Sequence, residues 1–510
     1  MTDVMTEVET GSVKPEIRAF HVNFSDAELV ELRRRIKATR WPERELVNDD
    51  TQGVQLATAQ KLARYWATDY DWRKVEARLN ALPQFITEID GLDIHFIHVR
   101  SKHENALPLI VTHGWPGSII EQLKIIDPLT NPTAHGGKAS DAFHLVIPSL
   151  PGFGFSGKPT TTGWDPARIG RAWVELMKRL GYTRFVAQGG DWGGMVTDVM
   201  GTQAPPELLG IHLNWIFAVP PEIDKAIQTG GKLPPNLSDD ERRACEQIAF
   251  AYQKGIGYAI EMANRPQTLY ATADSPVGLA AWFLDHDARS YEMIARVFDG
   301  QREGLTRDDV LDNVTLTWLT NTAISCSRIY WESKFSFFTP KGVAIPVAVS
   351  AFPDEVVTVP RSWAERAYPN LIHYNKLEKG GHFAAWEQSR ISSWPSCARD
   401  SRRYASELGS VGKNAGRVCK HSPGAGASSE MRLLRTDHGP RCTALGVGSA
   451  NRVEHVDKLL GVADTQGFHR LLVRRVDDRV NLVEQSAALG RHLALHLSPI
   501  RKVALSSDVA

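Results

Sequence analysis

The 510-residue sequence lacks several features that would point to particular classes of protein. No apolar run reaches the roughly 18–20 residues that a membrane-spanning helix needs. Lys+Arg and Asp+Glu both number 59, so no net charge favours binding to nucleic acid or to an acidic membrane surface. The five cysteines are scattered without a CxxC spacing, which is typical of a reducing compartment. We therefore expect a soluble, cytoplasmic protein without a transmembrane segment or a nucleic-acid partner.

The N-terminal part has helical character and no apparent catalytic motif. Residues 1–15 are polar and acidic, unlike a signal peptide, and predict a disordered leader. From Ser25 a helix cap and an acidic first turn precede apolar residues at helical spacing. A second helix is predicted over residues 51–68. We assign residues 16–105 to an N-terminal region that wraps the core and clamps onto the main domain.

The next residues alternate between strand and helix patterns. Buried strands are predicted at three apolar runs: 107–112, 143–148 and the run that begins at Phe185. Strands that alternate with helices predict a mostly parallel sheet of the α/β class. We expect this core in two parts, residues 106–218 and 343–389. The Pro-interrupted helical segment between them, residues 219–342, is predicted to form a lid over the site.

The chemistry is predicted to centre on residues 185–195, FVAQGGDWGGM. An apolar run ends there in a turn flanked by glycines, and a helix-like pattern follows. Such glycines let a strand turn sharply into a helix, which exposes the middle side chain at the top of the sheet. That residue is Asp191, where the serine version of this elbow has a hydroxyl. The carboxylate excludes a serine hydrolase and indicates a nucleophile that forms an ester intermediate.

Two later stretches supply partners for Asp191. One strand ends at Asp354 and Glu355, and a glycine turn after another strand precedes His382. The chain order of nucleophile, acid and histidine is that of the α/β-hydrolase fold. Because all of these residues follow strands, we predict a catalytic triad at the carboxyl ends of the sheet.

An oxyanion hole is predicted beside this triad. Residues 113–116, His-Gly-Trp-Pro, follow an early strand, where the α/β-hydrolase fold supplies one oxyanion-hole N–H. The residue after the nucleophile supplies the other. The two backbone donors would be those of Trp115 and Trp192, and they would stabilise the tetrahedral intermediate when an ester is cleaved.

Taken together, these stretches resemble the epoxide hydrolases of the microsomal type, with the N-terminal domain of that group. The resemblance covers roughly residues 16–389 and rests on RWP at 40–42, HGWPGS at 113–118, QGGDWG at 188–193, RPQTL at 265–269, DSPVGLAAW at 274–282 and GGHFAA at 380–385. It implies conversion of epoxides to vicinal diols without a metal or an organic cofactor. The partners would be a small apolar epoxide and water, and self-association is left open.

The resemblance implies a role for each triad residue. Asp191 would attack the less hindered epoxide carbon to give an alkyl ester. His382 would activate water to hydrolyse that ester, oriented by a carboxylate. The family position for this acid falls on Glu355. Asp354 is the alternative, although neighbouring side chains on an extended stretch point in opposite directions.

Ring opening produces an alkoxide and therefore needs a proton donor. In this family two lid tyrosines donate, and Tyr258 and Tyr330 match their positions. A phenol suits this task because it is neutral at pH 7 and still a good donor. We interpret Tyr252, Tyr270 and Tyr291 as structural. A haloalkane dehalogenase, which shares the Asp nucleophile, is the alternative enzyme, but it would need halide-binding groups in place of the tyrosine pair.

The resemblance ends after Gln388. The family continues with a proline and an amphipathic closing helix, whereas residues 390–510 form an atypical tail that contains three aromatic residues, Trp394, Tyr404 and Phe468. We hypothesise a reading-frame change near Gln388, which predicts a poorly ordered tail and lower stability; a genuine C-terminal extension is the alternative. An inactive homologue is a further alternative, against which the intact Asp191, His382 and a carboxylate argue.

Overall fold

The computed structural model of the protein describes residues 16–388. The predicted leader, residues 1–15, lies outside the described residues. So does the sequence after Gln388, and with it the hypothesised change of reading frame.

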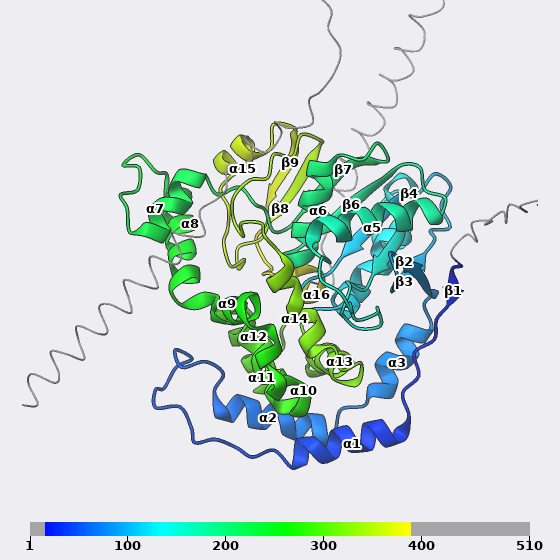
Figure 1. Ribbon diagram of the computed structural model, residues 1–510, viewed down its shortest axis with the longest axis vertical. Coiled ribbons are helices and arrows are strands. Elements are labelled where there is room, and N and C mark those ends of the chain that lie inside the picture. Colours follow the sequence, from blue (N-terminus) through cyan, green and yellow to red (C-terminus); the bar gives the residue numbers. More distant parts are fainter. Residues whose placement is uncertain (1–15, 389–510) are drawn as a thin grey trace, which may run out of the picture. The chain divides into compact units, whose positions relative to one another are not determined.

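One sheet organises the described residues. Its strands are β1 (Arg18–Ala19), β2 (Gln84–Ile89), β3 (Leu92–Val99), β4 (Leu107–Thr112), β5 (Phe143–Pro148), β6 (Phe185–Gly189), β7 (Leu208–Leu213), β8 (Val347–Ala351) and β9 (Leu371–Lys376). They lie in the order β1-β2-β3-β5-β4-β6-β7-β8-β9 (Figure 1). The first strands pair antiparallel as far as β5, and all pairs from β5 to β9 are parallel. The predicted mostly parallel sheet is confirmed.

Helices and short turns of helix cover this sheet. They are η1 (Ile119–Ile125), α4 (Ile126–Thr130), η2 (Pro132–His135), η3 (Ala139–Asp141), α5 (Pro166–Arg179), α6 (Asp191–Gln203), α15 (Arg361–Ala367) and α16 (Ala384–Glu387). Strands β6 and β8 are buried along their whole length. Burial on both faces explains their nearly continuous apolar sequence, because no position on such a strand faces water.

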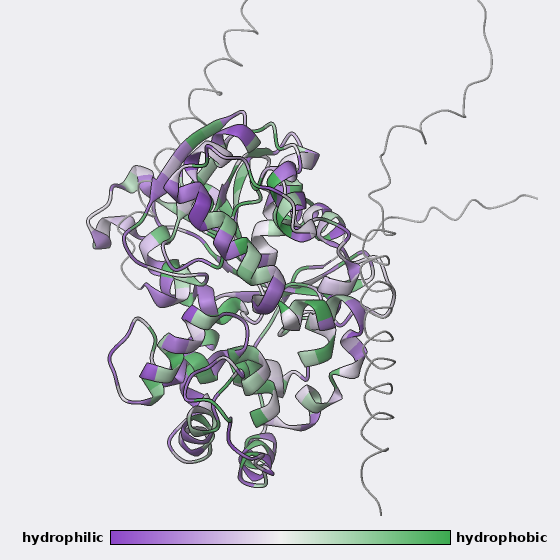
Figure 2. Ribbon diagram, turned by 90° about the vertical axis from the view of Figure 1, so that its left-hand side faces the viewer, coloured by the Kyte–Doolittle hydropathy of each residue, from purple (hydrophilic) through white to green (hydrophobic). Residues whose placement is uncertain are grey.

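The segment between β7 and β8 is built from helices. They are α7 (Pro221–Thr229), α8 (Asp239–Phe250), η4 (Ala251–Gly255), α9 (Gly257–Asn264), η5 (Pro266–Thr268), α10 (Tyr270–Asp274), α11 (Pro276–Leu284), α12 (Ala288–Phe298), α13 (Arg307–Leu319) and α14 (Ala323–Glu332). We call these helices the lid. Polar and apolar residues mix around their ribbons, as Figure 2 shows, and the apolar side of α12 is buried.

Three helices of the N-terminal region lie against the lid, below it and to its right in Figure 1. They are α1 (Asp26–Lys37), α2 (Leu56–Thr68) and α3 (Trp72–Asn80). Ser25 and Glu28 form a capping box that starts α1, as the sequence indicates. Trp66 Nε1 donates to Thr315 Oγ1 of α13 at 3.0 Å, and the Tyr70 hydroxyl donates to Asp312 Oδ1 at 2.8 Å. The N-terminal region thus extends the sheet through β1–β3 and holds the lid through its helices.

The second of these helices starts later than predicted. It begins at Leu56 instead of residue 51, because Gly53 has a φ of +95°, which is incompatible with a right-handed helix. No helix among residues 16–388 is long and apolar enough to cross a membrane.

Candidate active site

Asp191 lies at the junction of β6 and α6. Its φ is +50°, a left-handed conformation that is uncommon for a residue with a side chain and that clusters at functional sites. The neighbouring glycines make the turn tight. A Cβ at Gly189 would lie 2.0 Å from Gly193 O, and one at Gly193 would lie 2.0 Å from Thr112 O. The strand can therefore turn into the helix within one residue, and the carboxylate emerges at the carboxyl end of the sheet.

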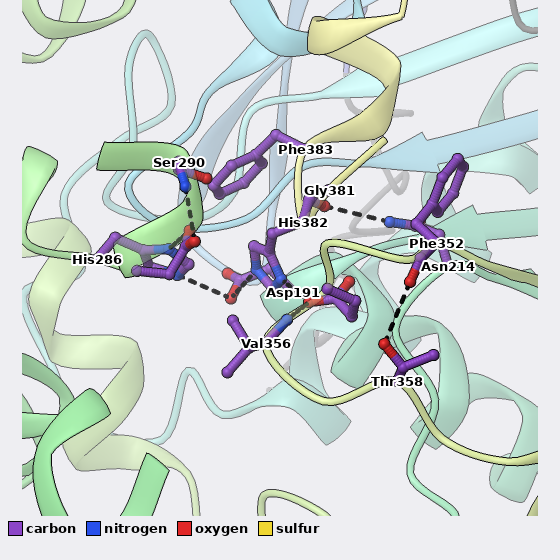
Figure 3. Close-up of polar contacts among 12 residues, drawn as sticks. Asp191, Asn214, His286, Ser290, Phe352, Val356, Thr358, Gly381, His382 and Phe383 are labelled. Atoms are coloured by element: carbon purple, nitrogen blue, oxygen red, sulfur yellow. Dashed lines mark hydrogen bonds and ion pairs between the residues drawn. The ribbon is translucent and has the colours of Figure 1, made fainter. Parts of the chain in front are cut away.

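His382 lies between two carboxylates (Figure 3). Its Nε2 is 3.1 Å from Asp191 Oδ2, and its Nδ1 is 2.5 Å from Glu355 Oε1. Glu355 follows β8 and His382 follows β9, so the adjacent ends of two parallel strands place them side by side. The Val356 N–H donates to Glu355 Oε1 at 2.8 Å and fixes that carboxylate. Glu355 is buried, whereas the alternative acid, Asp354, is exposed.

These contacts set the charges of the site. Burial alone would raise the pKa of Asp191, but His286 and His382 outweigh it and hold that pKa below its ordinary value. Burial alone would lower the pKa of His382, yet the carboxylates of Glu355 and Asp191 raise it well above 6.5. The resting site therefore favours an ionised Asp191 beside the protonated form of His382.

One of the two predicted oxyanion donors contacts Asp191. The Trp115 N–H donates to Asp191 Oδ1 at 2.6 Å. Gly114 makes this approach feasible, since a Cβ there would lie 2.2 Å from Asp191 Oδ1. Within the described residues the structure gives no hydrogen bond from the Trp192 N–H to Asp191. The Trp192 ring instead packs edge-on against Tyr330, with centroids 4.7 Å apart.

The lid places Tyr258 and Tyr330 against Trp115, in the loop after β4. Tyr258, on α9, stacks on Trp115 with centroids 5.0 Å apart, and Tyr330, on α14, meets Trp115 edge-on at 5.7 Å. Burial, followed by repulsion from neighbouring anionic groups that include Asp191, raises the pKa of both phenols well above 10. Both hydroxyls therefore keep their protons at neutral pH.

The three other lid tyrosines either bond to structural groups or face solvent. The Tyr252 hydroxyl donates to Asp224 Oδ1 at 2.7 Å, and the Tyr291 hydroxyl accepts from the Gln55 N–H at 2.9 Å. Tyr270 is 67% exposed. The Tyr252 bond joins two elements of the lid, and the Tyr291 bond joins the lid to the N-terminal region.

Two buried groups near the nucleophile were not predicted from the sequence. His286, between α11 and α12, places Nε2 3.9 Å from Asp191 Oδ2, and its ring centroid is 4.7 Å from that of His382 (Figure 3). Its Nδ1 is 3.0 Å from Asp287 Oδ2. Burial opposes protonation, but Asp191 and Asp287 outweigh it and raise the pKa of His286. The histidine between two acids, just after the DSPVGLAAW stretch, was the available clue.

The second group is Glu121, under the loop that carries Trp115. Its side chain lies in the space that a Cβ on Gly117 would occupy, and Gln122 Nε2 donates to its Oε1 at 2.7 Å. Burial, reinforced by the negative charge of Asp191, raises the pKa of Glu121 well above 4.5. Burial thus favours the protonated form of Glu121.

Asp191, His286 and His382 also form a set with metal-ligand chemistry. One possible ligand atom from each lies within 4.8 Å of the others, the one such group found among residues 16–388. The atom that would bind an ion, Asp191 Oδ2, is the same atom that faces His382. A carboxylate engaged by a cation is a weaker nucleophile, so we interpret the cluster as one for proton transfer.

The nucleophile is enclosed. The side chains of Asp191 and His382 are 9% and 0% exposed. A cleft of about 600 Å³ opens along α14, lined among others by Ile329 and Trp331, but neither Asp191 nor Tyr330 is part of its lining. This cleft therefore does not reach the side chains of Asp191 and Tyr330.

Comparison with known proteins decides the family. The model of the epoxide hydrolase N terminus matches residues 17–122, and that of the alpha/beta hydrolase fold matches residues 108–252. Epoxide hydrolase 1 of Oryctolagus cuniculus is 33% identical over 399 residues, which span 75% of this chain and 88% of its own. The chain belongs to the microsomal-type epoxide hydrolases. A protein of Stigmatella aurantiaca is 52% identical over 380 residues, covering 74% of this chain and 82% of its own.

Solved structures agree with this assignment. The juvenile hormone epoxide hydrolase of the silkworm Bombyx mori is 28% identical with a TM-score of 0.67, over 78% of this chain and 96% of its own. The epoxide hydrolase of Aspergillus niger is 29% identical with a TM-score of 0.63, over 78% and 97%. The predicted α/β-hydrolase fold and epoxide hydrolase activity are confirmed, and the dehalogenase alternative is set aside.

Proposed function

We propose that this epoxide hydrolase forms vicinal diols through an alkyl ester on Asp191, which water activated by His382 then hydrolyses. The proposal is supported by the different surroundings of the two Asp191 oxygens. Oδ1 accepts the Trp115 N–H, whereas Oδ2 faces His382. Oδ2 is thus the oxygen that attacks, and Oδ1 becomes the carbonyl oxygen of the ester, already in the oxyanion site.

The first half-reaction opens the ring. Asp191 Oδ2 attacks an epoxide carbon while Tyr258 or Tyr330 donates a proton to the departing oxygen. The low pKa of the nucleophile and the high pKa of the phenols support this division of roles, because one group is ionised and the others are protonated at the same pH.

The second half-reaction regenerates the enzyme. Esterification removes the negative charge of Asp191, and with it one of the two carboxylates that raise the pKa of His382. The proton of His382 passes to the tyrosinate that ring opening leaves behind, and the neutral imidazole is then available as the base. His382, oriented by Glu355, then takes a proton from water as the water oxygen attacks the ester carbon of Asp191.

A single turnover in ¹⁸O-labelled water tests this route. With enzyme in excess over styrene oxide, the first diol should carry no label, since its new oxygen comes from Asp191. Mass spectrometry of the peptide that contains Asp191 should show the label instead. Direct attack of water on the epoxide would put the label in the first diol and none in the peptide.

A further inference from the structure

His286 is a buried histidine to which the two half-reactions above assign no task. Its side chain is 2% exposed, and its Nε2 has no hydrogen-bond partner within residues 16–388. Leaving a buried polar atom unpaired costs about 1–3 kcal/mol. An atom of this kind that points at the nucleophile indicates a ligand that arrives during the reaction.

The hydrogen-bond partner of Nδ1 defines what Nε2 can do. The Asp287 carboxylate, 3.0 Å from Nδ1, accepts hydrogen bonds and has none to donate when ionised. Burial works against ionisation, but His286 outweighs it and lowers the pKa of Asp287 to about 2. Esterification removes the charge of Asp191, which is the first of the groups that raise the pKa of His286, and so favours the neutral ring. The one proton of the neutral ring is on Nδ1, and Nε2 presents a lone pair. His382 has the same layout with Glu355.

The ring of His286 is held in this orientation by its neighbours. Its centroid lies 5.2 Å from that of Tyr258, 5.4 Å from Phe383 and 5.9 Å from Trp115. Asp287 is fixed in turn, because its Oδ1 accepts the Ser290 N–H at 2.8 Å as the cap of α12. The pairs His286–Asp287 and His382–Glu355 thus both face Oδ2 of Asp191, from different parts of the fold.

The spacing suits a water molecule. His286 Nε2 and Asp191 Oδ2 are 3.9 Å apart, too far for a hydrogen bond. Two atoms that each bond one water at about 2.8 Å stand at most about 5.6 Å apart. The ligand atoms of His286, His382 and Asp191 all lie within 4.8 Å of one another, so one water can reach both imidazoles at the ester.

We propose that His286, backed by Asp287, holds the hydrolytic water together with His382, an inference that rests on the ester mechanism proposed above. The water donates one hydrogen to His382 Nε2 and the other to His286 Nε2. Only His382 removes its proton, as the oxygen attacks Cγ of Asp191. His286 keeps the second hydrogen bond throughout and so fixes the direction of attack.

The atoms of this step balance. Attack gives a tetrahedral carbon whose oxyanion, on Asp191 Oδ1, is stabilised by the Trp115 N–H. The bond from Cγ to Oδ2 then breaks, and Oδ2 leaves with the diol and takes the proton from His382. The carboxylic acid left on Asp191 returns its proton to His382, which restores the resting imidazolium.

Separate measurement of the two half-reactions tests the proposal. Enzyme in excess is mixed with styrene oxide and quenched at intervals, and intact-protein mass spectrometry follows formation and decay of the ester. In His286→Leu we expect ester formation within about threefold of the parent and ester hydrolysis slowed about 10–100-fold. His286→Gln, which keeps an acceptor oxygen, should recover part of the loss.

Asp287→Asn and Asp285→Asn make a matched pair. The asparagine at 287 keeps an oxygen for the Ser290 N–H but turns an N–H toward His286 Nδ1. This reverses the tautomer, so Nε2 loses its lone pair and ester hydrolysis should slow without a change in fold. Asp285 is exposed, and its variant should match the parent in both rates.

Three outcomes are distinguishable, and each would refute a different claim. Parent-like ester hydrolysis in folded His286→Leu and Asp287→Asn would refute the water-holding role. An equal fall in both half-reactions would show that His286 only maintains the shape of the site. If the parent turns over substrate but no ester ever forms, the ester mechanism itself is wrong, whatever His286 does.

Discussion

At the residue scale, burial favours Glu355 over Asp354 as the acid of the proposed triad. Glu355 is buried against His382, whereas Asp354 beside it is exposed. Glu355→Gln should keep the shape of the side chain but lose the charge that favours the imidazolium and orients Nδ1–H. Because the base acts in ester hydrolysis, we expect kcat to fall by about 10²–10⁴ with ester accumulating.

Asp354→Asn is the control for this prediction. It changes a carboxylate one residue away that does not contact His382, so kcat should stay within about twofold of the parent. Steady-state kinetics with styrene oxide, together with mass spectrometry of the quenched enzyme, gives both readouts. A larger loss of kcat in Asp354→Asn than in Glu355→Gln would show that Asp354, and not Glu355, is the acid.

The raised pKa of Glu121 should make the free energy of unfolding depend on pH. Its pKa is raised well above 4.5 by burial and by the charge of Asp191. The folded protein therefore keeps a proton that the unfolded chain loses as the pH rises above 4.5. This lowers the free energy of unfolding progressively, up to the pKa of the folded state.

Glu121→Gln removes this titration. Urea unfolding at several pH values between about 5 and 8 should show a smaller decline in the variant than in the parent. Glu104→Gln, at an exposed site, should decline as the parent does. Parallel curves for the parent and Glu121→Gln would show that Glu121 is ionised in the folded protein.

At the element scale, the N-terminal helices stabilise the lid. The Tyr70 hydroxyl donates to Asp312 Oδ1 in a buried site, where burial raises the pKa of Asp312 to about 7. Tyr70→Phe leaves that carboxyl short of a donor, which should cost about 1–3 kcal/mol of stability. Thermal unfolding should show a lower Tm for Tyr70→Phe, and the exposed Tyr270→Phe should unfold like the parent.

The local elements were largely predictable from the sequence. The turn at Asp191 is determined by adjacent glycines, and strand burial shows as continuous apolar runs, so both depend on neighbours in the chain. His286 depends on something else. Its role is set by Asp191 and His382, which lie far away in sequence and are joined to it only when the lid folds over the sheet. Glu121 likewise looks like an ordinary polar position of a short helix.

At the scale of the whole molecule, the site exists only when core and lid meet. Trp115 comes from the loop after β4 and Trp192 from the first turn of α6, whereas Tyr258, Tyr330 and Phe337 come from the lid segment. Their rings contact one another, with Trp192 and Phe337 centroids 5.6 Å apart. The reacting carboxylate is therefore surrounded by aromatic surface from both parts, which favours apolar epoxides.

The aromatic surroundings of Asp191 should make the enzyme prefer an apolar epoxide to a polar one. Burying a phenyl group contributes about 2–3 kcal/mol relative to leaving it in water, whereas the hydroxymethyl group of glycidol would lose its hydration. We expect kcat/KM for styrene oxide to exceed that for glycidol by about 30–140-fold, since about 1.4 kcal/mol corresponds to a factor of ten. Phe337→Ala should reduce this ratio while both substrates still alkylate Asp191. Equal kcat/KM values for the two epoxides would mean that the aromatic rings enclose the catalytic groups without contacting the substituent of the substrate.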